Sequence, residues 1–99
     1  MYGMIARIKA QPGKRAELAA ILLEGTGTMP GCLSYIVAED TAEPDTLVVT
    51  EAWESKQGHD DSLKLPSVQS TIAKGRPLIA GFEKVAEMVP LGGVGLPKA

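Results

Sequence analysis

The chain has 99 residues and a formal net charge of −2, with 10 Lys and Arg against 12 Asp and Glu, and 44% of its residues are hydrophobic. This length and composition predict one globular domain with a modest core. The cations are scattered, which argues against nucleic-acid binding, and no apolar run reaches the ~20 residues that span a bilayer, so we expect a cytoplasmic protein without nucleic-acid or membrane partners.

The first 40 residues predict a strand, a helix and a second strand. Residues 2–10, YGMIARIKA, alternate their side chains with the period of a strand. After the turn sequence QPG, residues 14–25 carry Leu and Ile at helical spacing, with glycine at the end. The turn sequence MPG then leads to residues 32–40, CLSYIVAED, which read as the second strand.

The second half predicts a strand, an interrupted helix and a last strand. Residues 46–54, TLVVTEAWE, form the third strand, and Ser55 is placed to cap a helix. Pro66 breaks that helix and opens a second helical segment, which Gly75 ends. Residues 81–89, GFEKVAEMV, form the fourth strand.

The order β-α-β-β-α-β predicts an α+β, ferredoxin-like domain over residues 1–90, an antiparallel four-stranded sheet with the helices on one face. Residues 91–99 form a Gly- and Pro-rich tail, either disordered or draped over a partner. The second and third strands carry apolar residues on both faces, and the helices cover only one. We therefore expect a homodimer whose sheets pack face to face as a dimeric α/β barrel, with a cavity between sheet and helices in each subunit.

Four short segments resemble the antibiotic biosynthesis monooxygenase (ABM) superfamily, which includes quinol monooxygenases. They are QPGKRAEL, MPGCLSY, VTEAWES and LPSVQ, and the resemblance runs from about Met4 to Val89. It implies a cofactor-independent monooxygenase that oxidises a quinol or polycyclic phenol with O₂. Such a site needs an apolar pocket, one base and one or two hydrogen-bond donors, but neither a metal nor a cofactor.

The spacing of the candidate residues differs from the commoner family pattern. In much of the family, a strand tryptophan is followed about nine residues later by a helix histidine. Here Ser62 occupies that place, and His59 comes six residues after Trp53. The haem-degrading branch resembles this chain less, because it uses an asparagine and this chain has none.

His59 is the candidate catalytic base, because free imidazole titrates near pH 6.5. Asp60 or Asp61 could orient its ring, and Leu63, one turn later, would direct His59 inward as a core residue of the same helix face. The alternative is a histidine near the surface beside two carboxylates. The three side chains His59, Asp60 and Asp61 do not share one helix face, so we predict no metal site.

Trp53, Tyr35, Leu63 and Ser62 are the candidate substrate-binding residues. Trp53 could be a stacking wall for an aromatic ligand, or only a packing residue of the core or dimer. Tyr35 and Tyr2 could donate to a substrate oxygen, or could bond to the backbone. Glu51 shares the strand face of Trp53, so inside a barrel it would need a partner such as Arg7.

Two other functions remain open for such a chain. One is a non-enzymatic dimeric barrel that binds a small hydrophobic ligand. The other is an isomerase on the same fold, which would use the base without oxygen. A ligand-sized pocket that receives the His59 imidazole would favour an enzyme, whereas a filled barrel would favour the non-enzymatic alternative.

Overall fold

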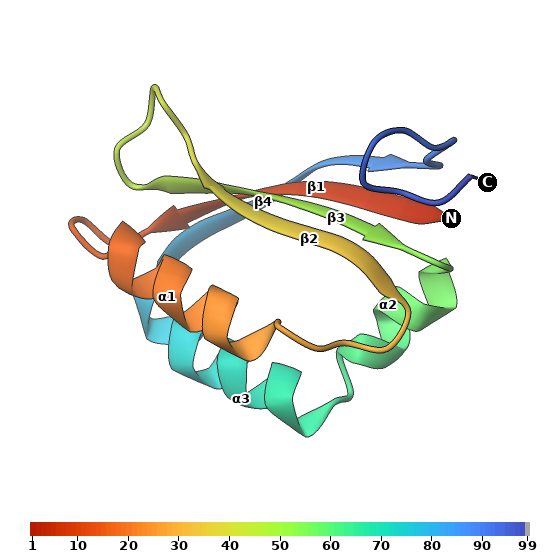
Figure 1. Ribbon diagram of the computed structural model, residues 1–99. Coiled ribbons are helices and arrows are strands. Elements are labelled where there is room, and N and C mark those ends of the chain that lie inside the picture. Colours follow the sequence, from red (N-terminus) through yellow and green to blue (C-terminus); the bar gives the residue numbers. More distant parts are fainter. Residues whose placement is uncertain (99) are drawn as a thin grey trace.

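The structure, a computed structural model, describes residues 1–98. Its elements in chain order are β1 (Tyr2–Ala10), α1 (Arg15–Gly25), β2 (Cys32–Glu39), β3 (Thr46–Trp53), α2 (Lys56–Ser62), α3 (Pro66–Gly75), the 3₁₀ helix η1 (Arg76–Leu78) and β4 (Ile79–Met88). The strands form one antiparallel sheet in the order β2-β3-β1-β4, and the helices lie together under one face of it (Figure 1). The predicted ferredoxin-like α+β fold is confirmed.

The second and third strands each end one residue earlier than predicted, and the larger correction is at the fourth strand. It begins at Ile79 and ends at Met88, whereas the sequence predicted residues 81–89. The difference arises because Gly75 ends α3 directly before η1. This single 3₁₀ turn is short, so β4 begins two residues earlier than predicted.

The core lies between the helices and the inner face of the sheet. Alternate residues of β1, including Ala6 and Ile8, are buried there beside their antiparallel partners Val49 and Leu47 of β3. Helix α1 contributes Leu18, which is fully buried against them. The period of two along each strand therefore places one apolar row against the helices and leaves the other row on the outer face.

The junction after β3 is built as the sequence predicted. Ser55 is extended, and its Oγ accepts a hydrogen bond from the Gly58 N–H at 3.0 Å, which caps α2. Leu65 is extended before Pro66, which opens α3 as its first residue. Helix α2 is consequently limited to seven residues, and this short helix carries His59 to the end of the inner face.

Helices α1 and α3 cross closely at a glycine. A Cβ atom built on Gly25 would overlap Thr71 Oγ1 and would lie 2.7 Å from Thr71 Cβ. Gly75 plays a similar part on α3, where its added Cβ would lie 3.2 Å from Leu18 Cδ1. The sequence identified both glycines only as helix ends, but Gly25 is also needed for the close approach of the two helices.

Gly25→Ala is therefore expected to destabilise the protein by about 1–3 kcal/mol, because the new methyl group forces the helices apart. The free energy of unfolding in urea measures this. Gly27→Ala is the matched control, since a Cβ there meets nothing within 4 Å, and it should change stability by less than about 1 kcal/mol. Equal effects of the two substitutions would contradict the account of this crossing.

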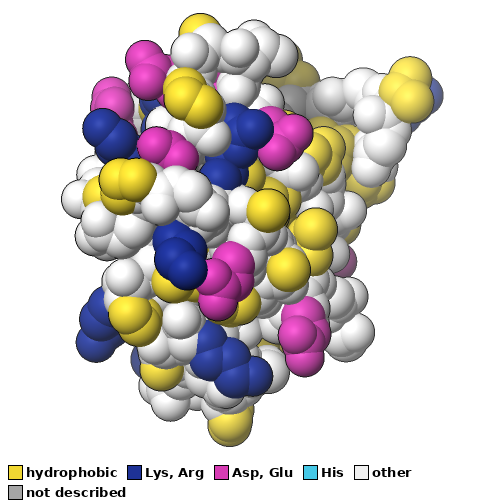
Figure 2. Space-filling view, turned by 90° about the vertical axis from the view of Figure 1, so that its left-hand side faces the viewer, with side chains coloured by type: hydrophobic (Ala, Val, Ile, Leu, Met, Phe, Trp, Pro, Cys, Tyr) yellow, Lys and Arg dark blue, Asp and Glu magenta, His cyan; other side chains and the backbone are white. Residues whose placement is uncertain are grey.

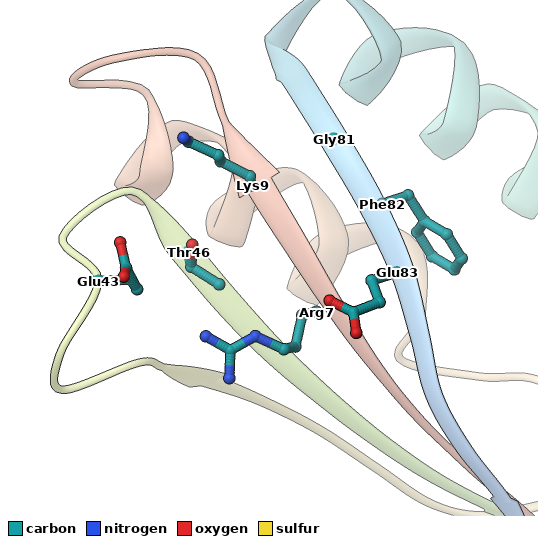
Figure 3. A pocket seen from close by; sticks show the side chains of 7 residues that line it. All are labelled: Arg7, Lys9, Glu43, Thr46, Gly81, Phe82 and Glu83. Atoms are coloured by element: carbon teal, nitrogen blue, oxygen red, sulfur yellow. The ribbon is translucent and has the colours of Figure 1, made fainter.

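The outer face of the sheet is partly apolar and partly charged. At one end a shallow groove of about 340 Å³ carries Arg7, Lys9, Thr46 and Glu83, and Figure 3 shows Arg7 and Glu83 projecting on the same side from adjacent strands. Arg7 forms an ion pair with Asp40 at 2.6 Å. Figure 2 shows acidic and basic side chains interspersed over the end that holds the β2–β3 connection.

The C-terminal segment after β4 folds back over the other end of the outer face. Its residues contain one turn, closed by a hydrogen bond from Leu96 N–H to Gly93 O at 3.1 Å, and no helix or strand through residue 98. Pro90 lies close to Gly3 of β1, and the segment borders a groove of about 350 Å³ with Ile36 and Thr50 of the sheet. Val94 and Leu91 on this segment point into solvent.

Candidate functional site

A cavity of about 320 Å³ opens between the inner face of the sheet and the helices. Its floor is apolar and comes from β1 and β3, with Met4, Ala6 and Val49 among its residues. Its volume lies within the range of small-molecule sites, roughly 300–1,000 Å³. A mainly apolar cavity with a few polar groups at one end suits a flat hydrophobic ligand.

His59 projects from α2 into this cavity, with 13% of its side chain exposed. Its ring lies between two aromatic side chains: the Tyr2 ring centroid is 5.3 Å away, and the Trp53 ring stands nearly perpendicular to it at 5.6 Å. Both contacts fall in the range of favourable aromatic packing. They hold the imidazole at the polar end of the cavity.

The two nitrogens of His59 face two different carboxylates. Nδ1 lies 3.1 Å from Asp60 Oδ1, and Nε2 lies 3.9 Å from Glu51 Oε1. The contact with His59 is the largest cause that lowers the pKa of Asp60, followed by the hydrogen bond from Lys56. Asp61 instead accepts a hydrogen bond from Gln57 at 2.8 Å. Of the two aspartates that the sequence offered, Asp60 is the one that contacts the imidazole.

Glu51 is the acidic residue of the cavity lining, and the sequence did not single it out as a site residue. It is 7% exposed, and its Oε1 accepts a hydrogen bond from Trp53 Nε1–H at 3.0 Å. Burial raises the pKa of Glu51, while the Trp53 hydrogen bond and the charge of His59 act in the opposite direction. The sequence does contain a signal for this role, because Glu51 is an acidic residue at an inward-facing position of a strand.

The suggested partner of Glu51 was wrong. Arg7 lies opposite Val48 in the β1–β3 register, whereas Glu51 lies opposite Met4, so the two side chains project from opposite faces of the sheet. Arg7 pairs with Asp40 instead. The groups that stabilise the Glu51 carboxylate are Trp53 and His59, the residues directly around the cavity.

The four candidate substrate-binding residues all line the cavity, in different ways. Trp53 is 1% exposed and forms part of its wall. The Tyr35 hydroxyl makes no hydrogen bond to the rest of residues 1–98 and is not sealed from the cavity, and burial raises its pKa. Ser62 is buried, but its hydroxyl already donates to the His59 carbonyl at 2.6 Å.

Leu63 is not the core residue that the sequence predicted. It is 48% exposed and lies at the rim of the cavity, because α2 ends at Ser62 and the chain turns away before Leu63 can pack beneath the helix. His59 nevertheless points inward. Its orientation comes from Tyr2, Trp53 and Asp60 rather than from a neighbour one turn along the helix.

Tyr2 borders the polar end of the cavity, and its hydroxyl bonds to a side chain rather than to the backbone. Its hydroxyl donates to Glu87 Oε1 of β4 at 2.7 Å, and the same oxygen receives the Lys84 ammonium at 3.2 Å. Desolvation and the adjacent Glu87 carboxylate raise the pKa of Tyr2 to about 12.

This raised pKa predicts a loss of stability at high pH. The unfolded chain releases the Tyr2 proton near pH 10 while the folded chain retains it until about pH 12, so folding stability falls between these values. We expect a contribution of about 1–2 kcal/mol, because water screens the half-exposed Glu87. Denaturation curves from pH 8 to 12 should show the advantage of the wild type over Tyr2→Phe shrinking above pH 10; a constant difference would contradict this.

The described residues contain neither a group of metal ligands nor a membrane-spanning helix. Within residues 1–98, no three His, Cys, Asp or Glu side chains are grouped so as to hold a metal ion. None of the helices in this range has the length and apolar character needed to cross a bilayer.

The fold and cavity can now be compared with known proteins. The sequence profile of the family described as antibiotic biosynthesis monooxygenase (ABM) matches residues 1–74. The chain belongs to the ABM family. This profile spans β1 through most of α3, and so includes every element that contributes His59, Glu51 and Trp53 to the cavity.

Solved structures agree with this family and extend over the whole domain. A Chloroflexus aurantiacus protein, provisionally named an antibiotic biosynthesis monooxygenase, is 54% identical, with a TM-score of 0.92 over 97% of this chain and 98% of that one. Rv0793 from Mycobacterium tuberculosis is 25% identical, with a TM-score of 0.77 over 94% and 97%. A Deinococcus radiodurans structure at 22% identity and a TM-score of 0.76, covering 95% and 96%, shares the fold.

The curated relative is more distant. An uncharacterised protein from Synechocystis sp. is 29% identical over 76 residues, which cover 74% of this chain and 52% of that protein. The ABM chain described here therefore spans about half the length of the curated relative that it matches.

Proposed function

We propose that this ABM protein is a cofactor-independent monooxygenase that oxidises a quinol or a polycyclic phenol with O₂. The observation that carries the proposal is the ligand-sized apolar cavity into which the imidazole of His59 projects. An apolar cavity accepts a flat aromatic ring, excludes bulk water and leaves one end for hydrogen bonding. Membership of the ABM family supports the class of reaction, and the cavity could hold the aromatic substrate.

The proposed reaction begins with removal of a hydroxyl proton, with His59 as base or hydrogen-bond partner. The resulting phenolate is electron-rich and passes an electron to O₂, after which the two radicals combine at a ring carbon. One oxygen atom remains on the ring and the other leaves as water, so a quinol and O₂ give a hydroxyquinone and H₂O. The substrate supplies both reducing equivalents. The open Tyr35 hydroxyl is the candidate donor to a substrate oxygen, and Trp53, Ser62 and Leu63 complete the binding surface.

The proposed assembly is a cytoplasmic homodimer. Ile36 is 55% exposed on the outer face, and Ile5 and Val48 are half-buried on the same face, so a second sheet would remove these apolar side chains from water. The domain would comprise residues 1–90 and the tail would comprise residues 91–99, of which residues 91–98 would lie at the edge of that interface.

Oxygen consumption tests the proposed reaction. The purified protein with a panel of benzoquinols, naphthoquinols and anthrones should consume O₂ and form a coloured quinone with at least one of them, and the product should not form under anaerobic conditions. His59→Ala should lower the rate by tenfold or more, because removing a proton-transfer group typically costs about 10²–10⁴ and water or Glu51 can replace only part of it. If no member supports O₂ uptake above the uncatalysed rate, the proposal is wrong.

The non-enzymatic alternative rests on the same cavity. A barrel that only binds a hydrophobic ligand would retain the same aromatic compounds without consuming O₂, and its affinity would not depend on His59. An isomerase would convert a substrate equally well with and without O₂, so the anaerobic arm of the experiment separates all three functions.

A further inference from the structure

We propose that Glu51 is the first acceptor of the substrate proton, and that His59 and then Asp60 carry this proton from the cavity to the surface. This inference rests on the proposed function and assigns three distinct roles within its site. It makes Glu51 a catalytic residue, because Glu51 borders the space where the substrate would lie.

The three side chains form a path of increasing exposure. The side chain of Glu51 is 9% exposed, that of His59 is 13% exposed and that of Asp60 is 46% exposed. Adjacent polar atoms along the path are 3.9 Å and 3.1 Å apart. A proton released in a dry cavity has to reach water before the next turnover, and this path connects the cavity with the solvent.

The hydrogen bond between His59 Nδ1 and Asp60 gives the path a direction. With the Nδ1 proton donated to Asp60, the Nε2 nitrogen presents its lone pair to Glu51. When Glu51 is protonated by the substrate, its O–H can transfer the proton to Nε2, and the Nδ1 proton can leave through Asp60. The O–H bond of Glu51 breaks as the N–H bond at Nε2 forms, so each step moves one proton and no electrons. A shift of about 0.7 Å brings the 3.9 Å separation to the 3.2 Å limit of an N···O hydrogen bond.

Glu51 is better placed than His59 to receive the proton first. It is the one carboxylate that lines the cavity within residues 1–98, and its Oε2 makes no hydrogen bond there and is not sealed off. Trp53 fixes the other oxygen. Both His59 nitrogens, in contrast, already face carboxylates.

The other ionisable groups around Glu51 are engaged elsewhere or are weaker acceptors. Tyr2 donates to Glu87, and Lys84, at the mouth of the cavity, is held by the same carboxylate. Burial and, to a smaller extent, the charge of Glu51 raise the pKa values of Tyr35 and Cys32, which keeps both in their neutral forms. Neither of them accepts a proton from a phenol under neutral conditions.

Rescue with imidazole distinguishes the first proton acceptor, Glu51, from the proton carrier, His59. We expect Glu51→Gln to lower kcat about 100-fold, and added imidazole should not restore it. His59→Ala should lower kcat about tenfold at low buffer concentration, and imidazole should restore most of it by carrying the proton out. Asp60→Asn should give a smaller, buffer-dependent loss, whereas Asp61→Asn, the matched control one residue along, should leave turnover unchanged. Substantial turnover in Glu51→Gln combined with an unrescued loss in His59→Ala would overturn the order of transfer.

A second measurement needs no turnover, so it tests the inference even if the protein does not oxidise quinols. The indole N–H signal of Trp53, the single tryptophan, reports the charge of Glu51 in an NMR pH titration because its proton is donated to that carboxylate. The variant His59→Gln removes an imidazole whose protonated form lowers the Glu51 pKa, so the midpoint should move to higher pH. Asp61→Asn should not move it. An unchanged midpoint in His59→Gln would show that Glu51 and His59 do not exchange a proton, and would overturn the inference even if the enzyme oxidises quinols.

Discussion

A Trp53→Ala variant should lose about 3–5 kcal/mol of folding free energy, the range for deleting a large aromatic side chain from a core. Trp53 is 1% exposed and packs with Tyr2, Met4 and Val68 in one of the two core clusters. Because domains are stable by only about 5–15 kcal/mol in total, this loss is a large share of the folding free energy. Circular dichroism during urea denaturation measures the loss. A cost below about 1 kcal/mol would show that Trp53 is not a structural wall of the cavity.

Trp53→Phe separates packing from hydrogen bonding at the same position. The phenyl ring retains much of the buried area but leaves Glu51 Oε1 without its donor, which should cost about 1–3 kcal/mol. The carboxylate then becomes still harder to ionise, so the pKa of Glu51 should rise further. The matched variant Glu51→Gln removes the charge, and the combined variant should lose less than the sum of the two single changes, because the indole and the carboxylate act together.

If the protein is the proposed dimer, Ile36→Lys should convert it into monomers. Ile36 lies on the outer face and alternates with Tyr35, which faces the cavity, so a lysine there meets the partner sheet without disturbing the site. A buried, unpaired polar group costs about 2 kcal/mol. A twofold-symmetric dimer contains two such lysines, so the total cost of about 4 kcal/mol raises the dimer Kd about 1,000-fold. Size-exclusion chromatography with light scattering measures the mass.

Leu23→Lys is the control for this change. Leu23 is 57% exposed, compared with 55% for Ile36, but it lies on α1, on the helix side of the sheet. It should leave the dimer intact. A monomeric wild type, or equal dissociation by both lysines, would contradict association through the sheets.

The local parts of this structure could be predicted from the sequence. Strand alternation, the Ser55 cap and the Pro66 break depend on neighbouring residues, and each is present where the sequence placed it. The inward orientation of His59 followed from the same local reasoning, although Leu63, used as part of the argument, is an exposed rim residue.

The interactions that define the site depend on distant residues and could not be predicted. The register of β1 against β3 decides that Arg7 and Glu51 face opposite ways, and the approach of α2 to the sheet decides that Glu51 meets His59. No short stretch of sequence encodes either distance. The start of β4 is a smaller example. The 3₁₀ turn η1 contains Pro77, but it ends where Leu78 O accepts a hydrogen bond from Gln11 N–H, next to the end of β1.

The position of the histidine relative to the commoner family pattern also becomes clear in three dimensions. His59 and Ser62 are three residues apart on α2, and both line the cavity. Moving the imidazole one turn towards the start of the helix places it beside Glu51, Tyr2 and Trp53. The chain therefore keeps an imidazole at the cavity while pairing it with a buried carboxylate.

The central claim is that a flat aromatic compound binds in the cavity next to His59. The most direct test is an NMR titration with an unreactive hydroxyanthraquinone, because the chain has one histidine and one tryptophan whose ring signals are unambiguous. We expect the His59 and Trp53 ring signals to shift together and saturate at one ligand per subunit, with nuclear Overhauser contacts from the ligand to His59. Saturable binding that leaves both signals unmoved and shifts only residues of the outer face, such as Ile36 and Thr50, would contradict the account.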